Sequence, residues 1–347
     1  AERLTVGGAA AVTAAAAVVR YGFAPGVDRF VVSGLALAAL AAVVGTAVEQ
    51  VGERLGPSAT GLLQSTLGNL PELFVGIFAL RAGLVGVVRA ALVGSVLASC
   101  LLVLGLAFMA GGFRHGRQKF DPTEPRLHAS LLVLAVGALL VPTLAARLNT
   151  PAASHSTALS TACAIVLVVV YLASLPFFLR RYRGQEESGV EPPPCWPLRL
   201  SVLIAVLASL AAAFASDWFV SALVKATASL GISQTFTGLV VVALASNAVE
   251  NAVGIRFALR PKPEFAIATT LSSPLQVALL LTPALVLLSG ALGPHHLTLV
   301  FPSLMVAALA TTVVAVVVVI YDGEYTWLEG VALVGLYVII AAGFWWG

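Results

Sequence analysis

The sequence predicts an all-α, polytopic membrane protein with about 11 transmembrane helices. Hydrophobic residues make up 59% of the chain and charged residues only 10%, whereas about a quarter of the residues in soluble domains are charged. Apolar runs of about 20 residues, the length that spans a bilayer as a helix, recur along the whole sequence. Little chain is left for a soluble catalytic domain, so we do not expect an enzyme.

Eleven apolar runs give the expected helices in chain order. They lie at 4–20, 30–54, 57–81, 84–111, 127–147, 156–180, 198–225, 232–259, 264–290, 297–321 and 326–346. The runs are bounded by Gly, Pro or charged residues, which mark the ends of helices. After the sixth run comes RRYRGQEESGVEPPPCWP, a polar and proline-rich stretch that we expect to link two halves.

The two halves are expected to be inverted copies of each other. With helix one set apart, helices two to six and seven to eleven form two groups of five. An odd number of helices per group reverses the orientation of the second group in the membrane. The predicted division is 1–29 for the N-terminal helix, 30–183 for the first five-helix repeat, 184–197 for the linker and 198–347 for the second repeat.

The positions of Lys and Arg predict the orientation, because cytoplasmic connections carry more of them. The side of the N-terminus holds twelve, namely Arg3, Arg54, Arg114, Arg117, Lys119, Arg126, Arg180, Arg181, Arg183, Arg199, Arg260 and Lys262. The other side holds six, namely Arg20, Arg29, Arg81, Arg89, Arg147 and Lys225. We therefore expect a cytoplasmic N-terminus and linker, and an external or lumenal C-terminus. These clusters are topology signals rather than a nucleic-acid surface; the lipid bilayer is the expected partner.

One short pattern occurs in both halves and carries a carboxylate into an apolar stretch. It reads NLPELFVGIFALR from Asn69 and NAVENAVGIRFALR from Asn247, with Glu72 and Glu250 at the same offset. Ser95 and Ser273 then follow the two glutamates at equal distances, since 95 − 72 = 23 and 273 − 250 = 23. An ionisable group at the bilayer centre costs at least ~2.5 kcal/mol. A duplicated pair therefore predicts a functional site.

The polar residues of the repeat offer only oxygen and amide groups. They are Glu72, Glu250, Asn69, Asn247, Asn251, Ser95, Ser99, Ser273 and Gln276. Such groups suit a hard cation such as Ca²⁺, which takes six to eight oxygen ligands at about 2.3–2.6 Å, whereas zinc and copper favour His and Cys. Burial lets the same carboxylates hold protons when the metal is absent. Cation and proton would then exclude each other at one site, which is the basis of antiport.

A break in the helix at 57–81 is expected beside Glu72. Pro71 removes a backbone hydrogen bond and Gly68 loosens the preceding turn. Broken helices of this kind offer backbone carbonyls to a cation near the middle of a membrane. The helix at 232–259 has Ala248 and Val249 at the matching positions and no proline.

Other interpretations of these polar residues stay open. A membrane glutamate can cap a neighbouring backbone or pair with Arg, and Ser95 and Ser273 can serve helix packing. Glu49 and Gln50 either line an access pathway or cap the end of the second helix. Asp217, beside Trp218, either belongs to the same pathway or anchors its helix at the interface.

At these residues the chain resembles the cation/proton exchangers of the calcium/cation antiporter superfamily over nearly its whole length. That family has GNATE in one half and GNAAEH in the other, where this chain has Gly68 to Glu72 as GNLPE and Ser246 to Asn251 as SNAVEN. The resemblance implies eleven helices, Ca²⁺/H⁺ exchange, and Glu72 and Glu250 as the central ligands. This chain departs from the family at Ser246, Asn251 and Ser99, and has SSPLQ at 272–276 in place of GSSTQ.

We therefore expect a secondary active antiporter that exchanges cytoplasmic Ca²⁺, or a related cation, for protons by alternating access. Glu72 and Glu250 would bind cation and proton in turn, and no cofactor is expected. Pro71 next to Glu72 is also typical of sodium/calcium exchangers, so a sodium-coupled exchanger of the Na⁺/Ca²⁺ or Na⁺/H⁺ type is the main alternative. A passive cation channel is a further one, and a homo-oligomer is compatible with the sequence.

Overall fold

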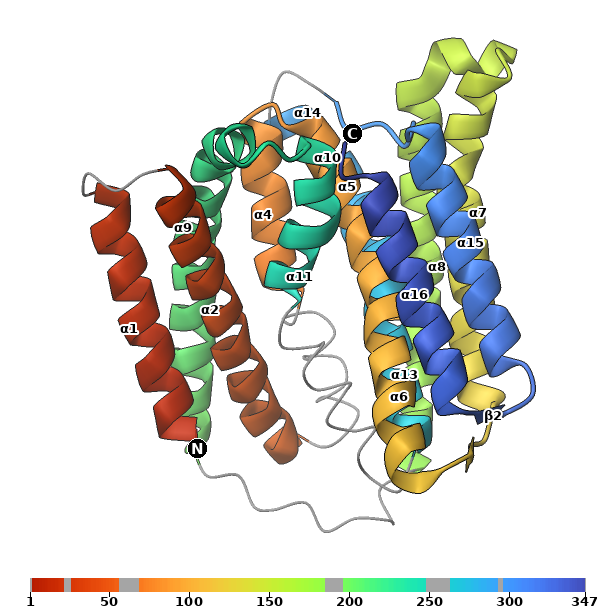
Figure 1. The fold of residues 1–347 in the computed structure, drawn as a ribbon, viewed down its shortest axis with the longest axis horizontal. Coiled ribbons are helices and arrows are strands. Elements are labelled where there is room, and N and C mark those ends of the chain that lie inside the picture. Colours follow the sequence, from red (N-terminus) through yellow and green to blue (C-terminus); the bar gives the residue numbers. More distant parts are fainter. Residues whose placement is uncertain are drawn as a thin grey trace. The chain divides into compact units, whose positions relative to one another are not determined.

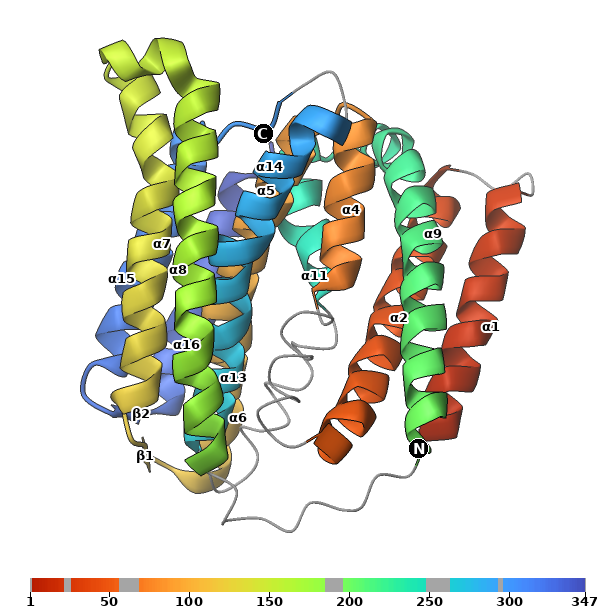
Figure 2. The same cartoon turned by 180° about the vertical axis from the view of Figure 1, so that it is seen from behind.

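The computed structural model is almost entirely helical and describes residues 2–21, 26–55, 69–184, 196–247, 263–292 and 296–346 (Figures 1 and 2). The chain forms two compact units. The first comprises Ala1–Ala82, Val169–Gly231 and Ala245–Val249; the second comprises Gly83–Val168, Ile232–Leu244 and Glu250–Gly347. Each unit takes segments from both halves of the sequence. Compact units and repeats divide the chain differently, so the repeat boundaries stay a prediction.

The first unit is a group of helices packed through small and aromatic residues. Its helices are α1 (Glu2–Tyr21), α2 (Gly26–Leu55), α4 (Leu70–Arg81), α9 (Leu198–Leu230) and the second part of α8 (Ser156–Gly184). The most extensive packing is between α2 and α9, while α1 lies on α2 and α4 lies on α9. Phe30 stacks on Phe219 with ring centroids 4.6 Å apart, next to Gly34, where a Cβ atom would lie 3.1 Å from the Phe219 ring.

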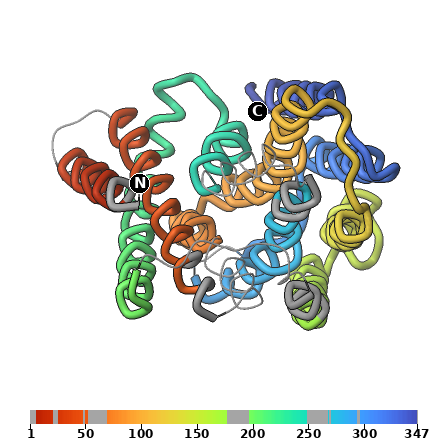
Figure 3. Tube along the Cα trace, turned by 90° about the horizontal axis from the view of Figure 1, so that it is seen from below, coloured from red at the N-terminus to blue at the C-terminus, as the bar shows by residue number. Residues whose placement is uncertain are grey.

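The second unit holds most of the remaining helices and a two-stranded sheet. Its elements are α5 (Val85–Leu97), η1 (Ala98–Val103), α6 (Leu104–His115), β1 (Gln118–Lys119), α7 (Thr123–Arg147), η2 (Pro151–His155), the first part of α8, α10 (Gln234–Phe236), η3 (Thr237–Val242), the start of α11 (Ala243–Ser246), α13 (Pro263–Gln276), η4 (Val277–Leu281), α14 (Thr282–Leu292), α15 (Ser303–Ile320), β2 (Glu324–Tyr325) and α16 (Trp327–Gly343). The long helices of each unit run roughly parallel to one another and are seen nearly end-on in Figure 3.

The described residues contain 7 helical stretches long and apolar enough to cross a membrane. They are Gly26–Ala47, Val85–His115, Thr123–Arg147, Pro151–Pro176, Leu198–Leu230, Thr270–Leu292 and Ser303–Ile320. Three shorter apolar helices lie at Val6–Arg20, Gln234–Ser246 and Trp327–Gly343. The prediction of an all-helical membrane protein is confirmed. A helix suits a lipid environment because it satisfies the hydrogen bonds of its backbone within its own segment.

Wide π-helical turns occur at equivalent places in the two halves. The two glutamates differ by 250 − 72 = 178, and moving η1 by this offset gives 276–281, which is where η4 lies. In η1 the N–H of Leu104 donates to the carbonyl of Ser99, and in η4 that of Thr282 donates to Val277, each five residues back. Turns of this kind are often found at functional sites. They directly follow the segments that carry Ser95 and Ser273.

A third wide turn, η3, explains a difference in length between the halves. The stretch from Thr60 to Asn69 has ten residues, but its counterpart from Thr237 to Asn247 has eleven. In η3 the N–H of Ala243 donates to Gly238, five residues back. A turn closed by such a bond holds one more residue than an α-helical turn, so η3 accommodates the extra residue.

Backbones approach very closely where α5 crosses η3 in the second unit. A Cβ atom on Gly94 would lie 1.9 Å from the carbonyl oxygen of Leu239, and one on Gly238 would lie 2.8 Å from the Cβ of Ala90. A second such crossing joins α6 and α16, where a Cβ on Gly105 would lie 2.8 Å from the carbonyl oxygen of Gly330. Small residues allow membrane helices to pack at this range.

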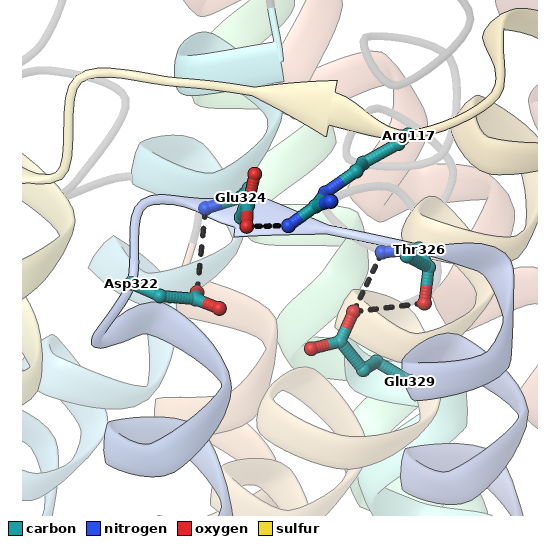
Figure 4. Close-up of polar contacts among 5 residues, drawn as sticks. All are labelled: Arg117, Asp322, Glu324, Thr326 and Glu329. Atoms are coloured by element: carbon teal, nitrogen blue, oxygen red, sulfur yellow. Dashed lines mark hydrogen bonds and ion pairs between the residues drawn. The ribbon is translucent and has the colours of Figure 1, made fainter.

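One end of the second unit is closed by the pairing of two connections. Strands β1 and β2 are antiparallel, with Gln118 opposite Tyr325 and Lys119 opposite Glu324. Figure 4 shows Arg117 reaching across the pair to form an ion pair with Glu324. Next to it, the Thr326 amide donates to Glu329 Oε2 at 2.6 Å in a capping box that starts α16. Tyr325 also stacks on Phe108, with ring centroids 4.0 Å apart.

At residues 297–301 of the same unit, the backbone forms hydrogen bonds with side chains instead of helical hydrogen bonds. The predicted helix at 297–321 begins later than expected, at Ser303, directly after Pro302. The preceding segment has these hydrogen bonds: Leu297 N to Ser289 Oγ (3.0 Å), Leu299 N to Ser160 Oγ (3.0 Å), Phe301 N to Thr143 Oγ1 (2.9 Å), Thr143 Oγ1 to the Leu299 carbonyl (2.8 Å) and Arg89 Nε to the Thr298 carbonyl (3.0 Å). These backbone groups are therefore satisfied without helical bonds.

We predict that Gly94→Ala destabilises the protein strongly. The added methyl group would overlap the Leu239 carbonyl, and overpacking of this kind costs about 1–3 kcal/mol or more. Gly86→Ala in the same helix is the matched control, since a Cβ there meets no atom within 4 Å. Thermal unfolding in detergent should show a clearly lower midpoint for Gly94→Ala only. Equal midpoints for the two variants would contradict the close crossing.

Candidate functional site

The helix that carries Glu72 begins where the sequence predicts a break. Asn69 lies in a turn, α4 starts at Leu70, and Pro71 occupies the first turn. Glu72 is only 4% exposed and Asn69 6%, so both polar side chains point into the interior of the protein. A carboxylate in the first turn of a helix is favoured by the helix dipole, while burial favours its neutral form. Glu72 is thus under two opposing influences.

The equivalent asparagine of the second half also lies in a turn. Helix α11 ends at Ser246, Asn247 follows in a turn, and the two side chains are 2% and 1% exposed. Helix α11 thus ends at this place without a neighbouring proline. Asn69, Glu72 and Asn247 belong to the same compact unit, although they come from different halves of the sequence. Glu250 and Asn251 lie outside the described residues, so their predicted roles stay predictions.

The predicted serine and glutamine ligands belong to the second unit. Ser95 lies in the last turn of α5 and is fully buried, and Ser99, in η1, is 3% exposed. Ser273 in α13 is 6% exposed, and Gln276 is the last residue of α13 before η4. Helix α13 packs against both α5 and η1. The structure thus places hydroxyl groups from both halves on helices in contact.

Three residues are predicted for an access pathway, and the structure describes the side chains of two of them, Gln50 and Asp217. These two side chains lie in different environments. Gln50 is buried, and its Oε1 accepts a hydrogen bond of 3.1 Å from the Trp196 amide. Asp217 is exposed on α9. Glu49 belongs to α2. An access role for these three residues stays a prediction.

The repeat comparison missed one buried polar residue near Ser273. Thr270 lies in α13 three residues earlier and is 5% exposed. Its equivalent in the first half is at 270 − 178 = 92, which is Leu92. A search for shared polar positions therefore passes over it. Among the described residues, no group of three His, Cys, Asp or Glu side chains could hold a metal ion.

Comparison with known proteins places the chain in a family. The family described as sodium/calcium exchanger protein matches residues 28–180 and 200–346. A Ca²⁺/H⁺ antiporter of Synechocystis sp. is 36% identical, over 91% of this chain and 90% of that protein. The Ca²⁺/H⁺ antiporter ChaA of Bacillus subtilis is 33% identical, over 92% of each. The solved structure of native YfkE is similar with a TM-score of 0.83 and 30% identity over 99% of each chain. This chain belongs to the sodium/calcium exchanger protein family.

Proposed function

We propose that this protein is a secondary active antiporter that exchanges cytoplasmic Ca²⁺ for protons. The observation that carries the proposal is the buried glutamate of the repeated motif, Glu72, at the start of a helix in a family of cation exchangers. Two relatives that span about nine-tenths of the chain are named Ca²⁺/H⁺ antiporters. The polar residues of the repeat offer oxygen and amide groups, the ligands that Ca²⁺ prefers.

Glu72 and Glu250 are the groups that bind cation and proton in turn. Two carboxylates neutralise one Ca²⁺ ion, and each accepts a proton once the ion leaves, so the buried site carries little net charge in either state. Asn69 and Asn247 supply amide oxygens, and Ser95, Ser99, Ser273, Gln276 and Asn251 complete the oxygen set. Binding of either ion excludes the other, and alternating access by the two inverted halves couples the two fluxes.

The proposed topology has eleven spans, with the N-terminus and the linker in the cytoplasm and the C-terminus outside. Contacts between distant connections support it. In an alternating path of eleven helices, the connections joined by β1 and β2 follow helices four and ten and lie on one side. The contacts of Thr143 and Ser160 with 299–301 join the connections after helices five and nine, on the other side. Ser233, after helix seven, likewise donates to the Phe344 carbonyl near the C-terminus.

A sodium-coupled exchanger is the second candidate. The description of the matching family names sodium and calcium. In addition, Pro71 precedes Glu72, as in the sodium/calcium exchangers. The names of the two relatives favour protons as the coupling ion. A passive cation channel would need neither ion gradient.

Glu72→Gln and Glu250→Gln should each abolish proton-coupled Ca²⁺ flux. Each change removes a charged ligand. A loss of only about 1.4 kcal/mol of binding free energy already lowers the affinity for Ca²⁺ tenfold. The measurement is ⁴⁵Ca²⁺ uptake into proteoliposomes under an imposed pH gradient. Asp28→Asn, which alters an exposed carboxylate at the start of α2, is the control and should transport normally. Retained flux in both glutamine variants would refute the mechanism.

Imposed sodium gradients should drive little Ca²⁺ movement in the same vesicles. Protons rather than Na⁺ occupy the carboxylates in the exchange that we propose, so uptake should follow the pH gradient and stop when an ionophore collapses it. Strong sodium-driven uptake without dependence on pH would favour the sodium-coupled exchanger. Uptake that persists with both gradients collapsed would favour a channel.

Labelling of single cysteines should reveal the orientation. Lys119→Cys in β1 and Ser154→Cys in η2 are both at exposed positions and would lie on opposite sides of the membrane. In a variant that lacks Cys100, Cys163 and Cys195, a membrane-impermeant maleimide applied to intact cells should label position 154 only. Permeabilised cells should label at both positions. Labelling of position 119 alone in intact cells would reverse the topology.

A further inference from the structure

Buried hydroxyl groups in these helices usually bond to their own backbone. Thr312 Oγ1 donates to the carbonyl of Ala308 at 2.7 Å, Ser216 Oγ to that of Ala212 at 2.7 Å, and Ser33 Oγ to that of Arg29 at 2.6 Å. Each bond reaches back four residues. Burial of a hydroxyl group in this arrangement costs little free energy, because its hydrogen bond to the carbonyl replaces a hydrogen bond to water. Such a hydroxyl group is satisfied without a ligand.

Thr270 departs from this rule. Its side chain is 5% exposed, and its Oγ1 has no hydrogen-bond partner. Among the Ser and Thr residues that the structure describes, Thr270 is the one with a buried hydroxyl group in this condition. A buried polar atom without a partner is unfavourable and calls for a ligand, an ion or a water molecule at that place.

A second oxygen atom of the same residue also lacks its usual partner. Pro274 lies inside α13, four residues after Thr270. Proline has no N–H group, so it cannot donate the helical hydrogen bond that the Thr270 carbonyl would accept. Thr270 therefore presents two oxygen acceptors, its hydroxyl group and its carbonyl, at one turn of a buried helix.

These two oxygens lie next to a predicted ligand. Residues three apart are neighbours on the surface of a helix, with Cβ atoms about 5–6 Å apart, so Thr270 and Ser273 share one face of α13. Helix α13 packs against α5 and η1, the elements that carry Ser95 and Ser99. The first half offers no such pair, because the equivalent positions are Leu92 and, since 274 − 178 = 96, Val96, both apolar and buried.

We propose that Thr270 is a further cation-binding position, at which the hydroxyl and carbonyl oxygens coordinate Ca²⁺ on its way to or from the glutamates. Neutral oxygen atoms are ordinary Ca²⁺ ligands, and a site without carboxylates of its own binds weakly enough to release the ion. The proposal rests on the transport function proposed above. It assigns this role to the second half of the chain alone.

Thr270→Val tests the hydroxyl group, because valine has nearly the same shape but cannot coordinate a cation. The Ca²⁺ concentration that gives half-maximal proton-coupled uptake should rise about three- to tenfold, the effect expected for loss of one neutral ligand. Thr270→Ser keeps the hydroxyl group and should stay within about twofold of the unmodified protein. Thr312→Val removes a hydroxyl group that bonds its own helix and should leave the half-maximal concentration unchanged.

Thermal stability separates a ligand from a structural hydroxyl group. Replacing a buried polar atom that has no partner by an apolar group of the same shape is neutral or stabilising, so Thr270→Val should unfold at the same temperature as the unmodified protein or higher. A structural hydroxyl would instead lower the unfolding temperature when removed. Weaker Ca²⁺ uptake combined with undiminished stability is the result that supports a ligand.

Pro274→Ala tests the carbonyl group. Alanine restores an N–H group that engages the Thr270 carbonyl within the helix, so the half-maximal Ca²⁺ concentration should rise here as well, again without loss of thermal stability. Normal Ca²⁺ dependence in both Thr270→Val and Pro274→Ala, with robust uptake by the unmodified protein, would overturn this proposal and leave the transport function intact. Absence of pH-driven uptake in the unmodified protein would instead overturn the transport function.

Discussion

The lack of water inside a bilayer is the constraint on which the rest of this structure depends. A helix meets it by bonding its own backbone, and most of the chain does so. Where the backbone leaves the helix, at 297–301, hydroxyl groups of Ser289, Ser160 and Thr143 supply the missing partners at 2.9–3.0 Å. Hydroxyl residues therefore have two distinct uses in this protein. Those that bond a backbone complete the scaffold, and one whose oxygen lacks such a bond is available to a ligand.

The same constraint explains why helices touch through glycine. Lipid tails are as apolar as leucine, so association depends on close packing rather than on removal of surface from water. At Gly94 the backbone of α5 meets the carbonyl of Leu239 in η3, and at Gly105 the backbone of α6 meets Gly330. The first of these contacts lies one residue before Ser95. The position of that serine is consequently determined by two backbones in contact rather than by rotatable side chains.

The apolar runs, and the Gly, Pro and charged residues that bound them, predict the helices well, because length and apolarity are what a membrane span requires. The start of the helix at 297 is wrong because its residues are as apolar as a span, while their backbone partners come from distant Ser and Thr side chains that hydropathy does not register. The wide turns η1 and η4 were not predicted, since a π turn depends on one hydrogen bond and leaves no mark in composition. Repeat comparison found Ser95 and Ser273, and the structure buries both. It could not find Thr270, whose counterpart is Leu92.

The two halves reach similar arrangements by different residues. Asn69 and Asn247 both lie in turns, yet Pro71 accompanies only the first, so the turn does not depend on proline. The second half has its own proline, Pro274, in the next helix along. Pro71 lies in the first turn of α4 beside Glu72, and Pro274 lies inside α13 beside Ser273. Their counterparts in the other half are both valine, Val249 and Val96. In the exchanger that we propose, the two halves would therefore offer different oxygen atoms to a cation, although the repeated motif supplies one glutamate from each.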